Sequence, residues 1–309
     1  MRDWTSAGLS RSMTTSRQPS PASATAQSPA SSIATLNSGA ACATSPHFDM
    51  PGVDTARGRL WIADHRRQSE RPAALFIHGA GGSHLSFPAA LRQLPSISPI
   101  LVDLPGHGRS PGAGRAGIAE YALDLVALLD SLAIDSAVML GHSMGGAIAQ
   151  WLALEHTARV DALALAGTGA RLPVNPALIK EIIDDPSATV IQITRWMWAK
   201  QAPDDLKRQT ADIMVATAPS VIQADFMACD GFDLTPRLAE IALPTLILAG
   251  DSDKMTPLSL SQELARGIAG SALAVIPKAG HMMLLEQPEH CAELIAAWLK
   301  RALAGAGCD

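Results

Sequence analysis

One serine set among glycines constrains this chain more than any other feature. The apolar run 137–140 leads into Gly141-His142-Ser143-Met144-Gly145-Gly146, and a helix-like stretch follows over 147–155. Strand, sharp turn and helix in this order predict a strained turn that lifts the Ser143 hydroxyl clear of the backbone. Gly141 and Gly145 suit such a turn, because a Cβ at either position would collide with a neighbouring element. The alternative is a glycine-rich helix start with an ordinary capping serine.

The bulk composition allows one substantial domain and excludes several kinds of partner. The chain has 309 residues, of which 48% are hydrophobic and 17% charged, with a net charge of -5. No basic block occurs and aromatic residues make up only 4%, so we expect neither nucleic acid nor an anionic membrane as a partner. No apolar run is long enough to span a bilayer.

The cysteines bear on metals and on location. Cys42, Cys229, Cys291 and Cys308 lack the spacing of metal ligands, so we expect no metal site. Nothing in the pattern requires an organic cofactor. In a chain of this length, reduced thiols in a cytoplasmic protein are the default expectation.

The first 45 residues differ in kind from the rest. They are rich in Ser, Thr, Ala and Pro and poor in large apolar side chains. Such a segment buries too little surface to offset its ordering entropy, so we predict a disordered tail over 1–45. Arg2, Arg11 and Arg17 give this tail a weak similarity to a transit peptide.

From residue 46 onward, short apolar strands alternate with helices. This alternation predicts an α/β fold, a mostly parallel sheet covered on both faces. The predicted strands cover 59–62, 73–77, 99–103, 137–140, 162–166, 245–249 and 273–276, and the clearest helices cover 118–132, 147–155 and 288–302.

The alternation stops between residues 169 and 236. Four helical stretches, 177–183, 188–198, 204–217 and 220–229, are separated by Pro186, Pro203 and Pro219. We therefore expect a core formed by 46–169 and 236–309, with a helical cap over 170–235. Open parallel sheets bind ligands at the carboxyl ends of their strands, where such a cap would lie.

A serine nucleophile needs a base, and the base needs an acid to orient it. His281 follows the last predicted strand, and Asp251 and Asp253 follow the strand before it. All lie past strand ends, at the same edge of the sheet as Ser143, and either aspartate could reach the imidazole. The one that does not is expected to be a turn residue that binds its own backbone.

The other histidines are weaker candidates for the base. His142 lies inside the turn, with a side chain expected to project away from the serine. His78 and His107 lie in glycine-rich loops and are expected to be hydrogen-bonded structural residues, and His290 is expected on the solvated face of the last helix.

Acyl transfer also needs two N–H groups that face the developing oxyanion. We expect one from Met144, which follows the nucleophile. We expect the other from Ala80, in the glycine-rich stretch 78–82 that follows a predicted strand. The alternative is that this stretch is only a tight turn or a phosphate cradle, although no phosphate-binding fingerprint fits it.

Five motifs in order resemble those of the alpha/beta-hydrolase family. They are His78-Gly79-Ala80-Gly81-Gly82, the stretch from Asp103 to Ser110, the turn around Ser143, Gly250-Asp251-Ser252-Asp253, and Gly280-His281. The resemblance implies an eight-stranded sheet with a helical cap, and it favours Asp253 over Asp251 and supports Ala80. The form of the elbow is similar to that of bacterial lipolytic esterases.

The resemblance implies a carboxylesterase-type serine hydrolase that acts through an acyl-enzyme, and the apolar side chains of the cap lead us to expect esters of small to medium apolar acyl groups. His281 must be neutral to act as base, so we expect activity to fall in acid. Side chains of the cap that could line an acyl pocket are Trp196, Met197, Trp198, Met214, Phe226 and Met227, although packing of the cap helices on each other is the commoner role.

Two other functions remain open. A C–C hydrolase of meta-cleavage products, or an enol-lactonase, would act on substrates with a carboxylate. An arginine should then face Ser143, with Arg171 and Arg195 as candidates. A binding or receptor protein with slow turnover is a third possibility, which measurable ester hydrolysis would exclude.

Overall fold

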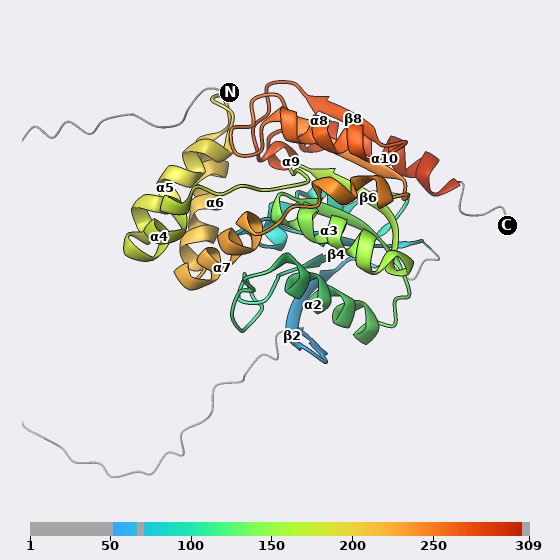
Figure 1. The fold of residues 1–309 in the computed structure, drawn as a ribbon, viewed down its shortest axis with the longest axis horizontal. Coiled ribbons are helices and arrows are strands. Elements are labelled where there is room, and N and C mark those ends of the chain that lie inside the picture. Colours follow the sequence, from blue (N-terminus) through green and yellow to red (C-terminus); the bar gives the residue numbers. More distant parts are fainter. Residues whose placement is uncertain (1–51, 67–70, 305–309) are drawn as a thin grey trace, which may run out of the picture. The chain divides into compact units, whose positions relative to one another are not determined.

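An eight-stranded sheet forms the centre of the structure, a computed structural model that describes residues 52–66 and 71–304. The predicted tail 1–45, the start of the predicted core, Cys42 and Cys308 lie outside these residues. The strand order is β1-β2-β4-β3-β5-β6-β7-β8, and helices cover the sheet (Figure 1). The predicted α/β fold is confirmed.

The strands run parallel to one another except at one edge. There β1 and β2 form an antiparallel hairpin, and β2 pairs antiparallel with β4. Every predicted strand is present. The bounds are β1 (Gly52–Thr55), β2 (Gly58–Asp64), β3 (Ala73–Ile77), β4 (Ser98–Val102), β5 (Ala137–His142), β6 (Val160–Ala166), β7 (Thr245–Gly250) and β8 (Ala272–Ile276).

Each central strand feeds two cores, because successive side chains point to opposite faces of a sheet. In β3, Leu75 and Ile77 belong to the core to which α2 (Ile118–Ser131), α3 (Met144–Glu155) and α8 (Leu258–Gly267) also contribute. Phe76 belongs to the opposite core, to which α1 (Ala89–Arg92), α9 (Met283–Glu286) and α10 (Pro288–Ala302) contribute. Burial on both faces explains why these strands are continuous apolar runs rather than alternating patterns.

Four helices are inserted between β6 and β7. They are α4 (Pro176–Asp184), α5 (Pro186–Met197), α6 (Asp204–Ala216) and α7 (Pro219–Asp230). They share a buried cluster that includes Ile182, Ile193 and Phe226 and that also takes in Met282 from the loop after β8. In Figure 1 they form the yellow-to-orange group at the left, beside the sheet. We call them the inserted helices.

Proline marks where the inserted helices begin. Pro186 and Pro219 are the first residues of α5 and α7, and Pro203 precedes α6. Proline suits a first helical turn, since the N–H it lacks would have no helical acceptor there. The prolines therefore predicted the boundaries between these helices correctly.

Helix α8 was not predicted from the sequence. Its segment contains Leu258, Leu260 and Leu264 among polar residues, and its buried side chains are Ser261 and Leu264. Leu260 and Leu264 are four residues apart, as on one face of a helix, so α8 was missed although its apolar residues have helical spacing. None of the helices in 52–66 and 71–304 combines the length and apolar character that a bilayer crossing requires.

A buried carboxylate on α2 joins the β1–β2 hairpin to the rest of the sheet. Asp124 is 2% exposed. It accepts hydrogen bonds from Arg57 Nε at 2.7 Å and from Arg115 Nε at 2.8 Å. Arg57 lies in the hairpin turn and Arg115 in the loop before α2, so one side chain connects three segments.

We predict that Asp124→Asn lowers the free energy of unfolding by about 1–3 kcal/mol, because the two arginines lose the charge with which they pair and one of the two acceptor oxygens. Asp130→Asn is the matched control on the same helix. The Asp130 side chain is 61% exposed and pairs with Arg159, so its loss costs less than about 1 kcal/mol. Denaturant unfolding curves measure both, and equal losses would contradict the prediction.

Candidate active site

Ser143 lies in a strained turn between β5 and α3. Its backbone has φ 54° and ψ -120°, a region that costs a non-glycine residue about 1–3 kcal/mol. Its N–H donates to the carbonyl of Ala166 at 2.9 Å, which fixes the turn against β6. The strain is held by the surrounding structure, as expected for a nucleophile elbow.

Two glycines allow the turn to pack so closely. A Cβ on Gly145 would overlap the carbonyl oxygen of Ile77 at the end of β3, and a Cβ on Gly141 would overlap the carbonyl of Gly145. In both cases the obstacle is backbone, which cannot rotate away. The predicted reason for glycine at these positions is confirmed.

His281 and Asp253 meet at the same edge of the sheet, in the loops that follow β8 and β7. His281 Nδ1 donates to Asp253 Oδ2 at 2.9 Å. Both residues are buried, at 1% and 7% exposure. The other carboxylate oxygen of Asp253 accepts the N–H groups of Met255 at 2.8 Å and Thr256 at 3.0 Å.

Thr256 adds a contact that the sequence did not suggest. Its hydroxyl donates to Asp253 Oδ2 at 2.6 Å and lies 3.1 Å from His281 Nδ1. A serine or threonine three residues after an aspartate is common in turns, so nothing in the sequence marks Thr256 as part of the site.

The electrostatics of the pair favour one protonation state. Burial acts most strongly on Asp253 and by itself would raise its pKa, but the charge of His281 and the hydrogen bonds from His281 and Thr256 outweigh it. The pKa of Asp253 therefore lies below its ordinary value. An ionised carboxylate at this position keeps the proton of His281 on Nδ1 and leaves Nε2 as an acceptor.

Asp251, the other candidate, binds backbone instead. It is exposed and accepts the Lys278 N–H at 2.8 Å and the Ser252 hydroxyl at 2.8 Å. The structure thus brings Asp253, and not Asp251, to His281.

Ser143 and His281 open onto two apolar cavities. One extends between the glycine-rich loop and the inserted helices, and the other extends toward Leu172 and Leu260. The residues common to both linings are Ala80, Ser143, Phe226, Met255 and His281. The serine and histidine thus face a shared apolar space with two lobes.

The orientation of the Ala80 N–H follows from the hydrogen bonds of its neighbour. The carbonyl of Gly79 accepts from His78 Nδ1 at 2.8 Å and from the Gly82 N–H at 3.0 Å. A trans peptide is planar, so the Ala80 N–H points opposite to that carbonyl. As the first residue of α3, Met144 has an N–H for which the helix offers no acceptor.

His78 is the neutral residue that holds this loop. Its Nε2 accepts the Leu104 N–H at 3.1 Å, so the ring proton must be on Nδ1. Burial and the nearby charge of His107 lower the pKa of His78 to about 4. The prediction of a structural loop histidine is confirmed, and the loop it holds contains Ala80.

His142 contributes a contact that the sequence did not reveal. Its Nε2 donates to the backbone carbonyl of His281 at 2.9 Å, and the two rings lie 4.8 Å apart between centroids. Burial and the charge of His281 lower the pKa of His142 to about 3, so this ring stays neutral. His290, by contrast, is exposed on α10 as predicted.

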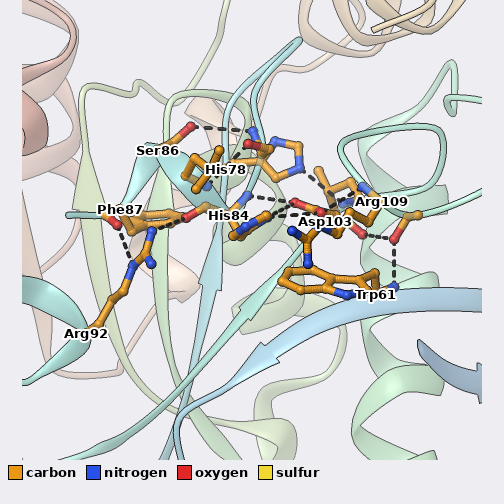
Figure 2. Close-up of polar contacts among 12 residues, drawn as sticks. Trp61, His78, His84, Ser86, Phe87, Arg92, Asp103 and Arg109 are labelled. Atoms are coloured by element: carbon orange, nitrogen blue, oxygen red, sulfur yellow. Dashed lines mark hydrogen bonds and ion pairs between the residues drawn. The ribbon is translucent and has the colours of Figure 1, made fainter. Parts of the chain in front are cut away.

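Asp103 fixes the far end of the glycine-rich loop (Figure 2). Its buried carboxylate accepts the backbone N–H of His84 at 2.7 Å, His84 Nδ1 at 2.9 Å and the Arg109 N–H at 2.9 Å. Trp61 closes this cluster, with the Arg109 guanidinium 4.8 Å from its ring centre. Asp103 is thus a structural carboxylate, distinct from the pair at His281.

Glu286 connects the histidine loop to the inserted helices. Its carboxylate accepts the Gly280 N–H at 2.9 Å and the Ala199 N–H at 3.2 Å. The carbonyl of Met197 also accepts the His281 N–H, at 2.7 Å. These long-range contacts leave no local pattern in the sequence, and for that reason they were missed.

The predicted pocket residues divide into two groups. Met197, Met214 and Phe226 line the cavity at Ser143. Trp198 is buried among the inserted helices at 3% exposure, Trp196 packs against the same cluster, and Met227 faces solvent at 47% exposure.

Charged groups are kept away from the cavities. Arg171 lies 3.7 Å from Glu263 and is half-exposed, and Arg195 is exposed. Among the described residues, no lysine or arginine lines either cavity at Ser143. Nor does the described part of the chain hold a group of three side chains suited to a metal ion.

Comparison with known proteins identifies the family. The profile of the alpha/beta hydrolase family matches residues 74–294. A pimeloyl-[acyl-carrier protein] methyl ester esterase of Neisseria meningitidis is 30% identical over 260 residues, which span 77% of this chain and 82% of that protein. A 3-oxoadipate enol-lactonase of Acinetobacter baylyi is 29% identical over 76% of this chain and 91% of its own length.

The solved structures agree with the sequence relatives. An esterase from Exiguobacterium antarcticum superposes with a TM-score of 0.74 and 25% identity, over 81% of this chain and 98% of that one. Fold, sequence relatives and family profile point the same way. The chain belongs to the alpha/beta hydrolase family and is a hydrolase that acts on esters.

Proposed function

We propose that this chain is a serine esterase that cleaves neutral esters with small to medium apolar acyl groups. The observation that carries the proposal is the placement of Ser143. It occupies a strained turn, in a cavity that it shares with His281, and the ring of His281 is bound to the buried carboxylate of Asp253. This is the order of groups that nucleophilic acyl transfer requires.

In the first step, Ser143 Oγ attacks the ester carbonyl while His281 Nε2 takes its proton. Asp253 holds the ring through Nδ1 and stabilises the imidazolium that forms. His281 then gives the proton to the departing alcohol, which leaves an acyl group on Ser143. Water, activated by the same nitrogen, attacks the acyl-enzyme and releases the acid.

The N–H groups of Ala80 and Met144 are proposed to hold the oxyanion. Two features support Ala80: it lines both cavities at Ser143, and the clamped Gly79 carbonyl turns its N–H away from the loop. Such donors act on charge that exists only in the transition state, so they raise the rate more than they raise substrate affinity.

The inserted helices are proposed to act as a cap, and residues 170–235 therefore as the cap of a core formed by 46–169 and 236–309. Ile193, Met197 and Met214 form an apolar wall of the cavity at Ser143. We assign this lobe to the acyl group and the lobe toward Leu172 and Leu260 to the alcohol.

The enol-lactonase relative keeps a second function in view. A C–C hydrolase or an enol-lactonase would bind a substrate carboxylate, yet Arg171 and Arg195 lie elsewhere and the linings are apolar. A neutral ester suits these walls better, because an unpaired carboxylate is costly to bury.

We also propose a cytoplasmic location, where the free thiols of Cys229 and Cys291 would stay reduced.

We predict that Ser143→Ala lowers kcat toward p-nitrophenyl esters by about 10⁶-fold while the fold is kept. Ser252→Ala, at an exposed serine in the loop of Asp253, is the control and keeps full activity. Hydrolysis rates and circular dichroism check both. Retained turnover in Ser143→Ala would exclude Ser143 as the nucleophile. Turnover of only lactones or diketo acids by the parent enzyme would point to a different substrate class.

We predict that log kcat/KM rises with pH along a limb of slope one and then levels off, because a single histidine base must lose one proton before it can act. Asp253, with its lowered pKa, stays ionised along this limb, and His142, with a pKa of about 3, stays neutral. A limb of slope two, or full activity at about pH 4, would contradict a single histidine base.

We predict that Ile213→Trp shifts preference toward shorter acyl chains. Ile213 is a half-buried residue of α6 that lines the proposed acyl lobe. Excluding two methylene groups costs about 1.6 kcal/mol, or roughly tenfold in kcat/KM for the longer ester. Val215→Trp, on the same helix at 62% exposure, is the control. An unchanged chain-length profile in Ile213→Trp would place the acyl group elsewhere.

A further inference from the structure

A buried carboxylate outside the proposed triad contacts the loop of Ala80. Asp225 lies on α7 and is 0% exposed. Its Oδ2 accepts the Gly81 N–H at 2.9 Å and His107 Nε2 at 2.8 Å, and its Oδ1 accepts the Tyr121 hydroxyl at 2.5 Å. One side chain of an inserted helix thus takes three donors from three segments of the core.

The partners of His107 fix its charge. Its Nδ1 lies 3.1 Å from the carbonyl of Pro105, which can only accept, and its Nε2 faces the Asp225 carboxylate. Both ring nitrogens therefore donate, and His107 is an imidazolium. Burial would lower the pKa of His107, but the charge of Asp225 outweighs it and raises that pKa.

The contact at Gly81 acts on the peptide that follows Ala80. Gly81 has φ +62°, and its N–H shares a planar peptide with the Ala80 carbonyl. The peptide before Ala80 is held by His78 and the Gly82 N–H, both bound to the Gly79 carbonyl. With Asp225 on the other side, both peptides that flank Ala80 are fixed.

We propose that Asp225 is a positioning residue for the oxyanion hole. By holding the Gly81 N–H, it sets the direction of the neighbouring Ala80 N–H. His107 neutralises the carboxylate at 2.8 Å, so the charge of Asp225 does not oppose the negative charge that develops on the substrate oxygen. The inference rests on the proposed function, because it requires Ala80 to serve the oxyanion.

The test is Asp225→Asn, which keeps the volume and one acceptor oxygen but loses the charge and the second acceptor. A displaced oxyanion donor costs about tenfold to a hundredfold in kcat, with KM for a p-nitrophenyl ester within about twofold of the parent. Phenylboronic acid, which forms a tetrahedral adduct with a serine hydroxyl, should lose affinity by a similar factor. An unchanged kcat in the folded variant would overturn the proposal, as would a rise in KM without a fall in kcat.

Asp124→Asn is the matched control, because Asp124 is also a buried carboxylate with cationic partners but contacts Arg57 and Arg115 rather than the glycine-rich loop. It should lower stability and leave kcat and boronate affinity unchanged. If both variants lost kcat equally, the effect of Asp225 would be structural and the proposal wrong. Ser143→Ala tests the proposed function separately from the role of Asp225. If Ser143→Ala is inactive and Asp225→Asn is fully active, only the positioning role is rejected.

Should Asp225→Asn not fold, Tyr121→Phe carries the same test. It removes the donor to Oδ1 and leaves the contacts of Oδ2 with Gly81 and His107 in place. We expect kcat to fall by about threefold or more with KM unchanged, because a loosened carboxylate holds Gly81 less well. A kcat equal to that of the parent enzyme would then overturn the proposal.

Discussion

The close approach of α3 to the end of β3 is the constraint on which the site depends. It exists because Gly145 has no side chain, so that the first turn of α3 can lie against the carbonyl of Ile77. Ser143, with its positive φ, immediately precedes this turn, and the start of α3 lies beside the glycine-rich loop that follows β3. Backbone packing thus places Ser143, the proposed nucleophile, and the N–H groups around it.

Loops at this edge of the sheet are ordered by buried carboxylates rather than by apolar packing. Asp103, Asp225 and Asp253 are each buried, and each accepts at least three hydrogen bonds. Each also pairs with a histidine. A buried charge is tolerable only when it is compensated in this way. Loops held in this way suit the proposed oxyanion site, whose donors must be in place before the charge develops.

Two kinds of feature were predictable from the sequence. They are strands and helices with a clear apolar pattern, and residues that the local backbone conformation requires. Strand β3 and helix α10 match the predicted segments 73–77 and 288–302, because continuous apolar strands and an amphipathic helix carry their own signal. The glycines around Ser143 were predictable because the turn leaves no room for a Cβ at Gly141 or Gly145. The roles of Ser143, Asp253, His281, Ala80 and Met144, and the division into tail, core and cap, remain proposals.

What the sequence left open depends on contacts between distant segments. Whether Asp251 or Asp253 meets His281 is decided by how two loops pack, and no spacing encodes that. Some contacts of the site join residues 25 or more positions apart in the chain. Examples are Thr256 with His281, Glu286 with Ala199, and Asp225 with Gly81. Helix α8 was missed although Leu260 and Leu264 have helical spacing.

The attachment of the inserted helices has a consequence for protein engineering. Helix α7 contributes Asp225 to the glycine-rich loop, and the end of α5 contributes the Met197 carbonyl to the backbone of His281. A chimera that takes these helices from another hydrolase would change more than the lining of the cavity, because it would also lose the contacts of Asp225 and of the Met197 carbonyl. Grafts that retain α7 and the end of α5, and vary α6 alone, would alter one wall of the cavity at Ser143 while preserving the contacts to His281 and to the glycine-rich loop.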